Sequence, residues 1–202
     1  MNTATAAVIF DEEKHTYTKD GALIPSVTTV LRQLYNFDFV HPDVLAAKAA
    51  LGTAVHKACE LDDADDLDDE SLAPAALPYL QGYRKFKRDK LTKVVATELI
   101  VYSAMGYAGK LDLLTEFDGE LWLIDWKTPL SISAAVGLQT AGYAGALPRE
   151  LLPRVGHKVR RGALQLKADG NYKLHEFKDH NDYPTFISFL NAYRWTKRHY
   201  PS

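Results

Sequence analysis

The chain has 202 residues, of which 47% are hydrophobic and 25% are charged, and its formal net charge is −2 at pH 7. These values fit one globular domain with a substantial core. No apolar run is long enough to span a bilayer, and the N-terminus lacks the basic and apolar regions of a signal peptide, so we expect a cytoplasmic protein. The single cysteine, Cys59, excludes intramolecular disulfides, a cysteine-based zinc site and a cysteine-ligated iron–sulfur cluster.

Turn and capping residues predict the elements of the first half of the chain. The stretch "HTYTKDGALIPSV" alternates and turns at its Asp-Gly pair, which predicts a small hairpin. Ser26 is suited to cap a short helix that follows this hairpin. An alanine-rich helix is expected over residues 41–62, because a proline and an aspartate open it, and a third helix over residues 75–91.

Charge is unevenly distributed along the sequence. Seven acids crowd into residues 62–70, which we expect to form an exposed loop. Two segments are basic, residues 83–93 and the C-terminal stretch from Arg154 onward. Basic segments of this kind suit a polyanionic ligand, although a solvated surface explains any one of them equally well.

The second half of the chain changes to a strand pattern. An Asp-Gly pair at residues 118–119 joins two of the strands, which is a strong hairpin signal. The order of these elements predicts an α/β or α+β sandwich, since helices are followed by a strand meander, a helix, more strand and a last helix. The expected elements are strands over residues 93–103, 107–117 and 120–128, a helix over 131–147, a hairpin over 160–177 and an amphipathic helix over 183–200.

The strand "LWLIDWKTPL" carries two charges in an apolar run. Strand side chains alternate between faces, so Asp125 and Lys127 share a face, which we expect to be open, while Trp126 packs into the core. The hairpin places Asp112 opposite Asp125. Facing carboxylates repel each other unless a proton or a cation lies between them, and a hard divalent cation suits such oxygen ligands. Alternatively, Asp125 and Lys127 form a simple ion pair at a strand edge.

Two helices present further polar side chains at helical spacing. Gly52, His56 and Glu60 lie along one face, where the glycine would permit close approach of another backbone. Gln139 and Tyr143 share a face directly after the strand that carries the charges. Each of these residues also suits an ordinary structural role.

The motifs "GTAVH", "TEL", "GKLD", "IDWK" and "QTAGY", in this order, resemble the PD-(D/E)XK nuclease superfamily, most closely its RecB-type branch. That branch contains phage and bacterial exonucleases. The resemblance implies an α/β, restriction-endonuclease-like core, in which a central mixed β-sheet is flanked by helices. It implies one nuclease domain over residues 1–202, with an N-terminal hairpin and helix over 1–42 and the catalytic core over 43–202.

The resemblance also implies roles for single residues. The matching residues are the metal ligands His56, Glu98, Asp112, Asp125 and the backbone carbonyl of Trp126, the catalytic lysine Lys127, and Gln139 and Tyr143, which support the site and touch DNA. The basic side chains expected to guide the DNA strand are Arg84, Lys85, Lys87, Arg88, Arg160 and Arg161. Where the family motif has Pro-Asp, this sequence has Leu111-Asp112. The proline is replaced, but the carboxylate that would coordinate the metal is kept.

The implied function is a DNA exonuclease dependent on Mg²⁺ or Mn²⁺, acting in phage or prophage recombination or repair in the cytoplasm of a bacterial or phage-infected cell. Its expected substrate is single- or double-stranded DNA, with a preference for ends. A single-strand annealing or recombination protein is an expected partner. No membrane is expected. The alternative is a nucleic-acid-binding or protein-interaction module that has the nuclease fold and does not cut.

Overall fold

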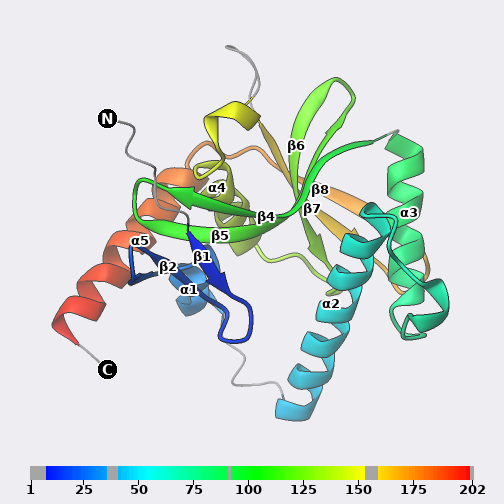
Figure 1. The fold of residues 1–202 in the computed structure, drawn as a ribbon, viewed down its shortest axis with the longest axis horizontal. Helices are drawn as coiled ribbons and strands as arrows, with labels where there is room; N and C mark the ends of the chain where they lie inside the picture. Colours follow the sequence, from blue (N-terminus) through cyan, green and yellow to red (C-terminus); the bar gives the residue numbers. More distant parts are fainter. Residues whose placement is uncertain (1–7, 36–40, 91, 153–158, 201–202) are drawn as a thin grey trace.

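The computed structural model describes residues 8–35, 41–90, 92–152 and 159–200, and it combines helices with two β-sheets (Figure 1). No described helix is long and apolar enough to cross a membrane. The strands and helices are, in chain order, β1 (Ile9–Asp11), β2 (Thr16–Lys19), β3 (Ala22–Ile24), α1 (Val27–Leu31), α2 (Pro42–Asp63), α3 (Leu77–Lys90), β4 (Lys93–Ser103), β5 (Tyr107–Phe117), β6 (Glu120–Lys127), α4 (Ala135–Ala144), β7 (Arg160–Leu166), β8 (Tyr172–Phe177) and α5 (Asp182–His199). Single 3₁₀ turns lie at Arg32–Leu34, Asp69–Ser71 and Arg149–Leu151.

The larger sheet has five strands in the order β4-β5-β6-β7-β8, and the smaller sheet contains β1, β2 and β3. Neighbouring strands of the larger sheet are antiparallel except β6 and β7, which run parallel. A parallel pair needs a crossover connection, and α4 lies within it. The central mixed sheet flanked by helices is therefore confirmed.

Both faces of the larger sheet are covered by helices (Figure 1). Trp122, Ile124 and Trp126 of β6 pack in a core with residues of α2 and α3. Leu123 points to the other face and packs in a second core with residues of α1, α4 and α5. Alternation places Asp125 on this second face. The expectation of an open face is wrong, because Asp125 is only 1% exposed.

The three predicted hairpins are present, and their turns explain why glycine is needed. Gly21, Gly119 and Gly170 have φ values of 78°, 75° and 76°, in the left-handed region that favours glycine. The predicted cap is also confirmed, since the Ser26 hydroxyl accepts a hydrogen bond from the Thr29 N–H at 2.9 Å. Strand β1, which precedes the first hairpin, was not predicted.

The acidic segment at residues 62–70 is only partly a loop. Its first two residues, Asp62 and Asp63, form the last turn of α2. The Asp63 side chain is 2% exposed and pairs with Lys87 of α3 at 2.7 Å. It also accepts hydrogen bonds from the hydroxyls of Tyr83 at 2.6 Å and Thr97 at 3.0 Å. The start of the acidic segment therefore joins α2 to α3 and to β4.

We expect Asp63→Ala to lower the free energy of unfolding by roughly 2–4 kcal/mol, because Tyr83 and Thr97 lose their shared acceptor and Lys87 loses one of its carboxylates. Urea denaturation measures this loss. Asp66→Ala is the matched control, since Asp66 is an exposed acid of the same segment, and its stability should equal that of the wild type. Equal stability of the two variants would show that the buried network is unimportant.

Candidate active site

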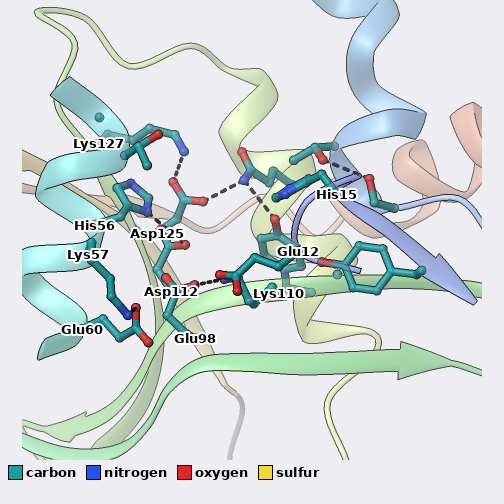
Figure 2. A pocket seen from close by; sticks show the side chains of 18 residues that line it. Glu12, His15, His56, Lys57, Glu60, Glu98, Lys110, Asp112, Asp125 and Lys127 are labelled. Atoms are coloured by element: carbon teal, nitrogen blue, oxygen red, sulfur yellow. Dashed lines mark hydrogen bonds and ion pairs between the residues drawn. The ribbon is translucent and has the colours of Figure 1, made fainter. Parts of the chain in front are cut away.

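A pocket of about 380 Å³ opens beside the first half of β5 and the end of β6, and most of the residues that the sequence motifs single out line it. Its lining comes from α2, β4, β5, β6, α4 and the N-terminal region. Figure 2 shows Asp112 and Asp125 in the middle of this pocket, with His56 and Lys127 on one side. Of the predicted metal-binding and catalytic side chains, those that line it are His56, Glu98, Asp112, Asp125, Lys127, Gln139 and Tyr143.

Asp112 and Asp125 meet where the paired strands β5 and β6 part. The last pair of the ladder is Leu113–Ile124, so each aspartate is the next residue on its strand. Beyond the ladder, the Asp112 carboxylate accepts a hydrogen bond from the Trp126 N–H at 2.7 Å. The predicted placement of Asp112 opposite Asp125 is consistent with this register.

Asp125 is held on both sides by neighbouring side chains. Its Oδ1 accepts a hydrogen bond from Gln139 Nε2 at 2.8 Å, and its Oδ2 forms an ion pair with the Lys127 ammonium. Gln139 Nε2 also donates to the Tyr143 hydroxyl at 3.2 Å. Gln139 and Tyr143 are 7% and 4% exposed. Their contacts therefore position Asp125, and DNA contact by either residue stays a prediction.

His56 reaches the pair of strands from α2. Its Nε2 lies 3.0 Å from the carbonyl oxygen of Trp126, which only accepts, so Nε2 carries the hydrogen. Its Nδ1 lies 3.5 Å from Asp112 Oδ1. In the neutral ring Nδ1 therefore keeps a lone pair beside the carboxylate, as a metal-binding histidine requires.

Glu98 completes a group of three donors that suits a divalent metal. The ligand atoms of His56, Glu98 and Asp112 lie within 4.8 Å of one another. Two carboxylates and one imidazole fit Mn²⁺, and the carboxylates fit Mg²⁺. Asp125 is not a member of this group, and its two oxygens contact Gln139 and Lys127. Metal binding by Asp125 and by the Trp126 carbonyl stays a prediction.

The close packing of these charges shifts their pKa values. Burial opposes the charged form of His56, but the carboxylate of Asp112 outweighs it and raises the His56 pKa to about 9. Burial raises the pKa of Asp125 to about 6, against the lowering effect of Lys127. The pKa of Asp112 is lowered, because His56 outweighs the effect of burial. Burial disfavours the Lys127 ammonium, but Asp125 and Asp112 raise its pKa.

We expect the affinity for Mn²⁺ to increase with pH, because the ion must displace the proton of His56. Below pH 9 this ring is mostly protonated, so the affinity should rise about tenfold per pH unit between pH 7 and 8.5 and level off above pH 9. Isothermal titration calorimetry at several pH values measures it. An affinity independent of pH over this range would exclude His56 as a ligand, and His56→Gln should remove most of the slope.

The glycine of the α2 motif is not required for close packing. A Cβ at Gly52 would meet its first neighbour, Thr128 Oγ1, at 3.9 Å, which is an ordinary contact. The expectation that Gly52 permits a close backbone approach is therefore wrong. In contrast, a Cβ at Gly109 would lie 2.5 Å from the ring of Tyr143, so the glycine of "GKLD" makes room for that ring.

The basic residues of α3 are largely occupied by protein contacts. Arg84 pairs with Asp62 at 2.7 Å and binds both oxygens of Asp69. Lys87 pairs with Asp62 and Asp63, and Lys85 donates to the Asn171 side chain at 2.8 Å. Arg88 is exposed. The acidic segment thus pairs with Arg84 and Lys87, and DNA guidance by the basic residues of α3 stays a prediction.

The basic residues at the start of β7 also make internal contacts. Arg160 pairs with Glu176 at 2.6 Å and lies over the Trp122 ring at 4.1 Å. Arg161 pairs with Asp182 at 2.9 Å and donates to the carbonyl of Gly137. The predicted basic stretch begins at Arg154, which lies outside the described residues. These contacts do not favour the predicted role of Arg160 and Arg161 in guiding DNA.

The sequence analysis assigned no role to several residues of the pocket. The Lys110 ammonium pairs with Glu98 at 2.6 Å. The spacing of Lys110 and Asp112, two residues apart on one strand face, matches that of Asp125 and Lys127 and was an available signal. Glu12 and His15 also line the pocket, and nothing in their local sequence indicates this.

Comparison with known proteins identifies the family. A family model described as the PD-(D/E)XK nuclease superfamily matches residues 29–190, which is most of the chain. No curated protein matches the sequence. A solved structure titled "Crystal structure of SSO0001" aligns with 71% of this chain and 73% of its own chain, at 13% identity and a TM-score of 0.37. Because the family model covers residues 29–190, the chain belongs to the PD-(D/E)XK nuclease superfamily, with a restriction-endonuclease-like fold and the activity class of a nuclease.

Proposed function

We propose that this protein is a metal-dependent deoxyribonuclease of the RecB-type branch, an exonuclease that acts in phage or prophage DNA recombination or repair. The observation that carries the proposal is the convergence of Asp112, Asp125 and Lys127 in one pocket with the donors of His56 and Glu98. The branch and the phage role rest on the order of the motifs and on the histidine of the "GTAVH" helix.

His56, Glu98 and Asp112 would hold Mg²⁺ or Mn²⁺, because their donor atoms lie within 4.8 Å of one another. A bound divalent ion lowers the pKa of a coordinated water and offsets charge on the phosphate. His56 is oriented for this role by the Trp126 carbonyl, which accepts its Nε2 hydrogen. These three candidate ligands belong to α2, β4 and β5.

Lys127 stabilises charge and does not remove a proton. Its pKa is raised by Asp125 and Asp112, so it is an ammonium at neutral pH and has no lone pair. An ammonium donates to the attacking water or to a phosphate oxygen, where negative charge develops in the transition state. Asp125, fixed by Gln139, holds the ammonium in position.

The test compares linear DNA labelled at each end with a covalently closed circle of the same sequence. With Mg²⁺ or Mn²⁺ we expect stepwise loss of nucleotides from linear DNA, a resistant circle and no reaction in EDTA. Degradation of the circle at the same rate would show that the protein is an endonuclease and not an exonuclease. Failure to degrade any DNA with either metal would overturn the proposed activity.

A further inference from the structure

The N-terminal sheet forms one wall of the active-site pocket, although it lies outside the family-model match. That match begins at residue 29, whereas β1, β2 and β3 end at Ile24. Figure 2 shows Glu12 and His15 across the pocket from His56 and Glu60 of α2. The earlier residues that line the pocket are Glu12, His15, Tyr17, Ser26 and Thr28. The family-model match therefore does not cover this wall.

The wall is fixed to the strand that carries Asp112. The Ala108 N–H donates to the carbonyl of Pro25 at 3.1 Å, and Ser26 forms a parallel bridge with Ala108. The Lys110 ammonium lies 5.4 Å from the centre of the Phe10 ring. Because these contacts involve β5 itself, the position of the wall is fixed relative to the strand that carries Asp112.

Three aromatic rings contact one another within this wall. Phe10 and Tyr17 stack at 4.7 Å, and the His15 ring meets Phe10 edge-on at 5.3 Å. Tyr17 is 2% exposed, whereas His15 is exposed and lines the pocket. His15 also closes the turn between β1 and β2, with a φ of 53°. The wall therefore presents an exposed imidazole at the pocket, packed edge-on against a stacked pair of rings, and aromatic side chains of this kind can stack on nucleobases.

Charge determines which part of a nucleotide meets this wall. The lysines among the described residues that line the pocket are Lys57, Lys110 and Lys127, which belong to α2, β5 and β6. The N-terminal wall contributes the carboxylate of Glu12. Lys57 and Lys110 pair with Glu60 and Glu98, and Lys110 also lies against Phe10 of the wall. Lys127, beside Asp125, is therefore the lysine to which we assign the phosphate, whereas Glu12 repels a phosphate. A nucleotide in this pocket therefore places its phosphate near Lys127 and its uncharged base at the wall.

The size of the pocket limits the substrate further. A volume of about 380 Å³ is at the lower end of the range for small-ligand pockets, which is the size of a single nucleotide. Asp125, at 1% exposure, lies at the base of the pocket, so the scissile phosphate must enter it. A base-paired nucleotide must first unstack and unpair, at a cost of a few kcal/mol. An unpaired end avoids this cost.

We propose that His15 stacks on the unpaired base beside the scissile phosphate, and that the preferred substrate is consequently single-stranded or frayed DNA. This inference rests on the proposed nuclease function and adds the substrate class. It assigns to the N-terminal sheet the role of a base-binding wall.

The test is equilibrium binding of the full chain to a short fluorescent oligo(dT) and to a fluorescent blunt duplex. Binding is measured by fluorescence anisotropy, with Ca²⁺ in place of Mg²⁺ or Mn²⁺. We expect His15→Ala to weaken oligo(dT) binding about 5- to 50-fold and duplex binding less than about twofold, and His15→Tyr to restore it, since stacking contributes this much per base. The matched control is His180→Ala, which alters an exposed histidine outside the pocket lining and should bind as the wild type does.

A second measurement reports stacking itself. Fluorescence of 2-aminopurine at the end of a single strand should be quenched by the wild type and not by His15→Ala. Equal quenching by both proteins, or equal loss of single-strand and duplex affinity in His15→Ala, would overturn the proposal. If the wild type cuts no DNA but binds oligo(dT) through His15, the nuclease function fails and the base-binding wall stands. If the wild type cuts DNA and His15→Ala binds oligo(dT) as tightly as the wild type, the nuclease function stands and the base-binding wall fails.

Discussion

Replacing Lys127 with alanine is expected to lower the rate of DNA cleavage by about a thousandfold, because in the proposed mechanism the ammonium beside Asp125 stabilises the developing negative charge. The variant should still fold. Asp125 loses its partner, but its pKa is already about 6 and rises further without the lysine, so the carboxyl takes up a proton instead of remaining a buried charge. Circular dichroism checks the fold, and release of labelled nucleotides measures the rate.

Lys57→Ala is the matched control for this prediction. Lys57 also lines the pocket, but its side chain is 58% exposed and pairs with Glu60. An exposed ion pair of this kind contributes little. Its removal should change the rate less than about threefold. A Lys127→Ala protein that cuts as fast as the wild type, or a Lys57→Ala protein that loses as much activity, would exclude the catalytic role of Lys127.

Asp112→Asn is expected to lower the affinity for Mn²⁺ by on the order of a hundredfold or more, with a matching loss of cleavage. An amide is a weaker ligand than a carboxylate, yet its oxygen still accepts the Trp126 N–H that Asp112 accepts at 2.7 Å. The strand geometry should therefore survive. Calorimetry measures the affinity.

The same variant has a second readout in the titration of His56. The charge of Asp112 is what raises the His56 pKa to about 9, since burial alone lowers it. In Asp112→Asn, NMR should show a His56 pKa well below 9. Asp118→Asn is the control, because Asp118 is an exposed acid in the turn of the same hairpin. An unchanged metal affinity and an unchanged His56 titration in Asp112→Asn would show that these two residues do not form one site.

The strands and their register could be predicted because their signals are local. Alternation and the Asp-Gly turn at residues 118–119 placed Asp112 opposite Asp125, and the ladder of β5 and β6 agrees. Helical spacing placed His56 on one face of α2, and its ring indeed reaches Asp112. Spacing within one element, or across one short turn, is visible in the sequence itself.

Contacts between distant elements could not be predicted in the same way. The sequence shows that Asp62 and Arg84 carry opposite charges, but only the packing of α2 against α3 makes them partners. Alternation likewise indicated which residues share a face with Asp125, but not that helices cover this face. The wall around His15 depends on where the N-terminal sheet docks on β5, which no local pattern records.

The most direct test of the site is a crystal of the wild-type protein soaked in Mn²⁺ and measured near the manganese absorption edge. We expect an anomalous peak among the His56, Glu98 and Asp112 side chains, with Lys110 displaced from Glu98. No anomalous peak in the pocket at a saturating metal concentration, or a peak bound only by residues outside this group, would contradict the metal site on which the proposed nuclease chemistry depends.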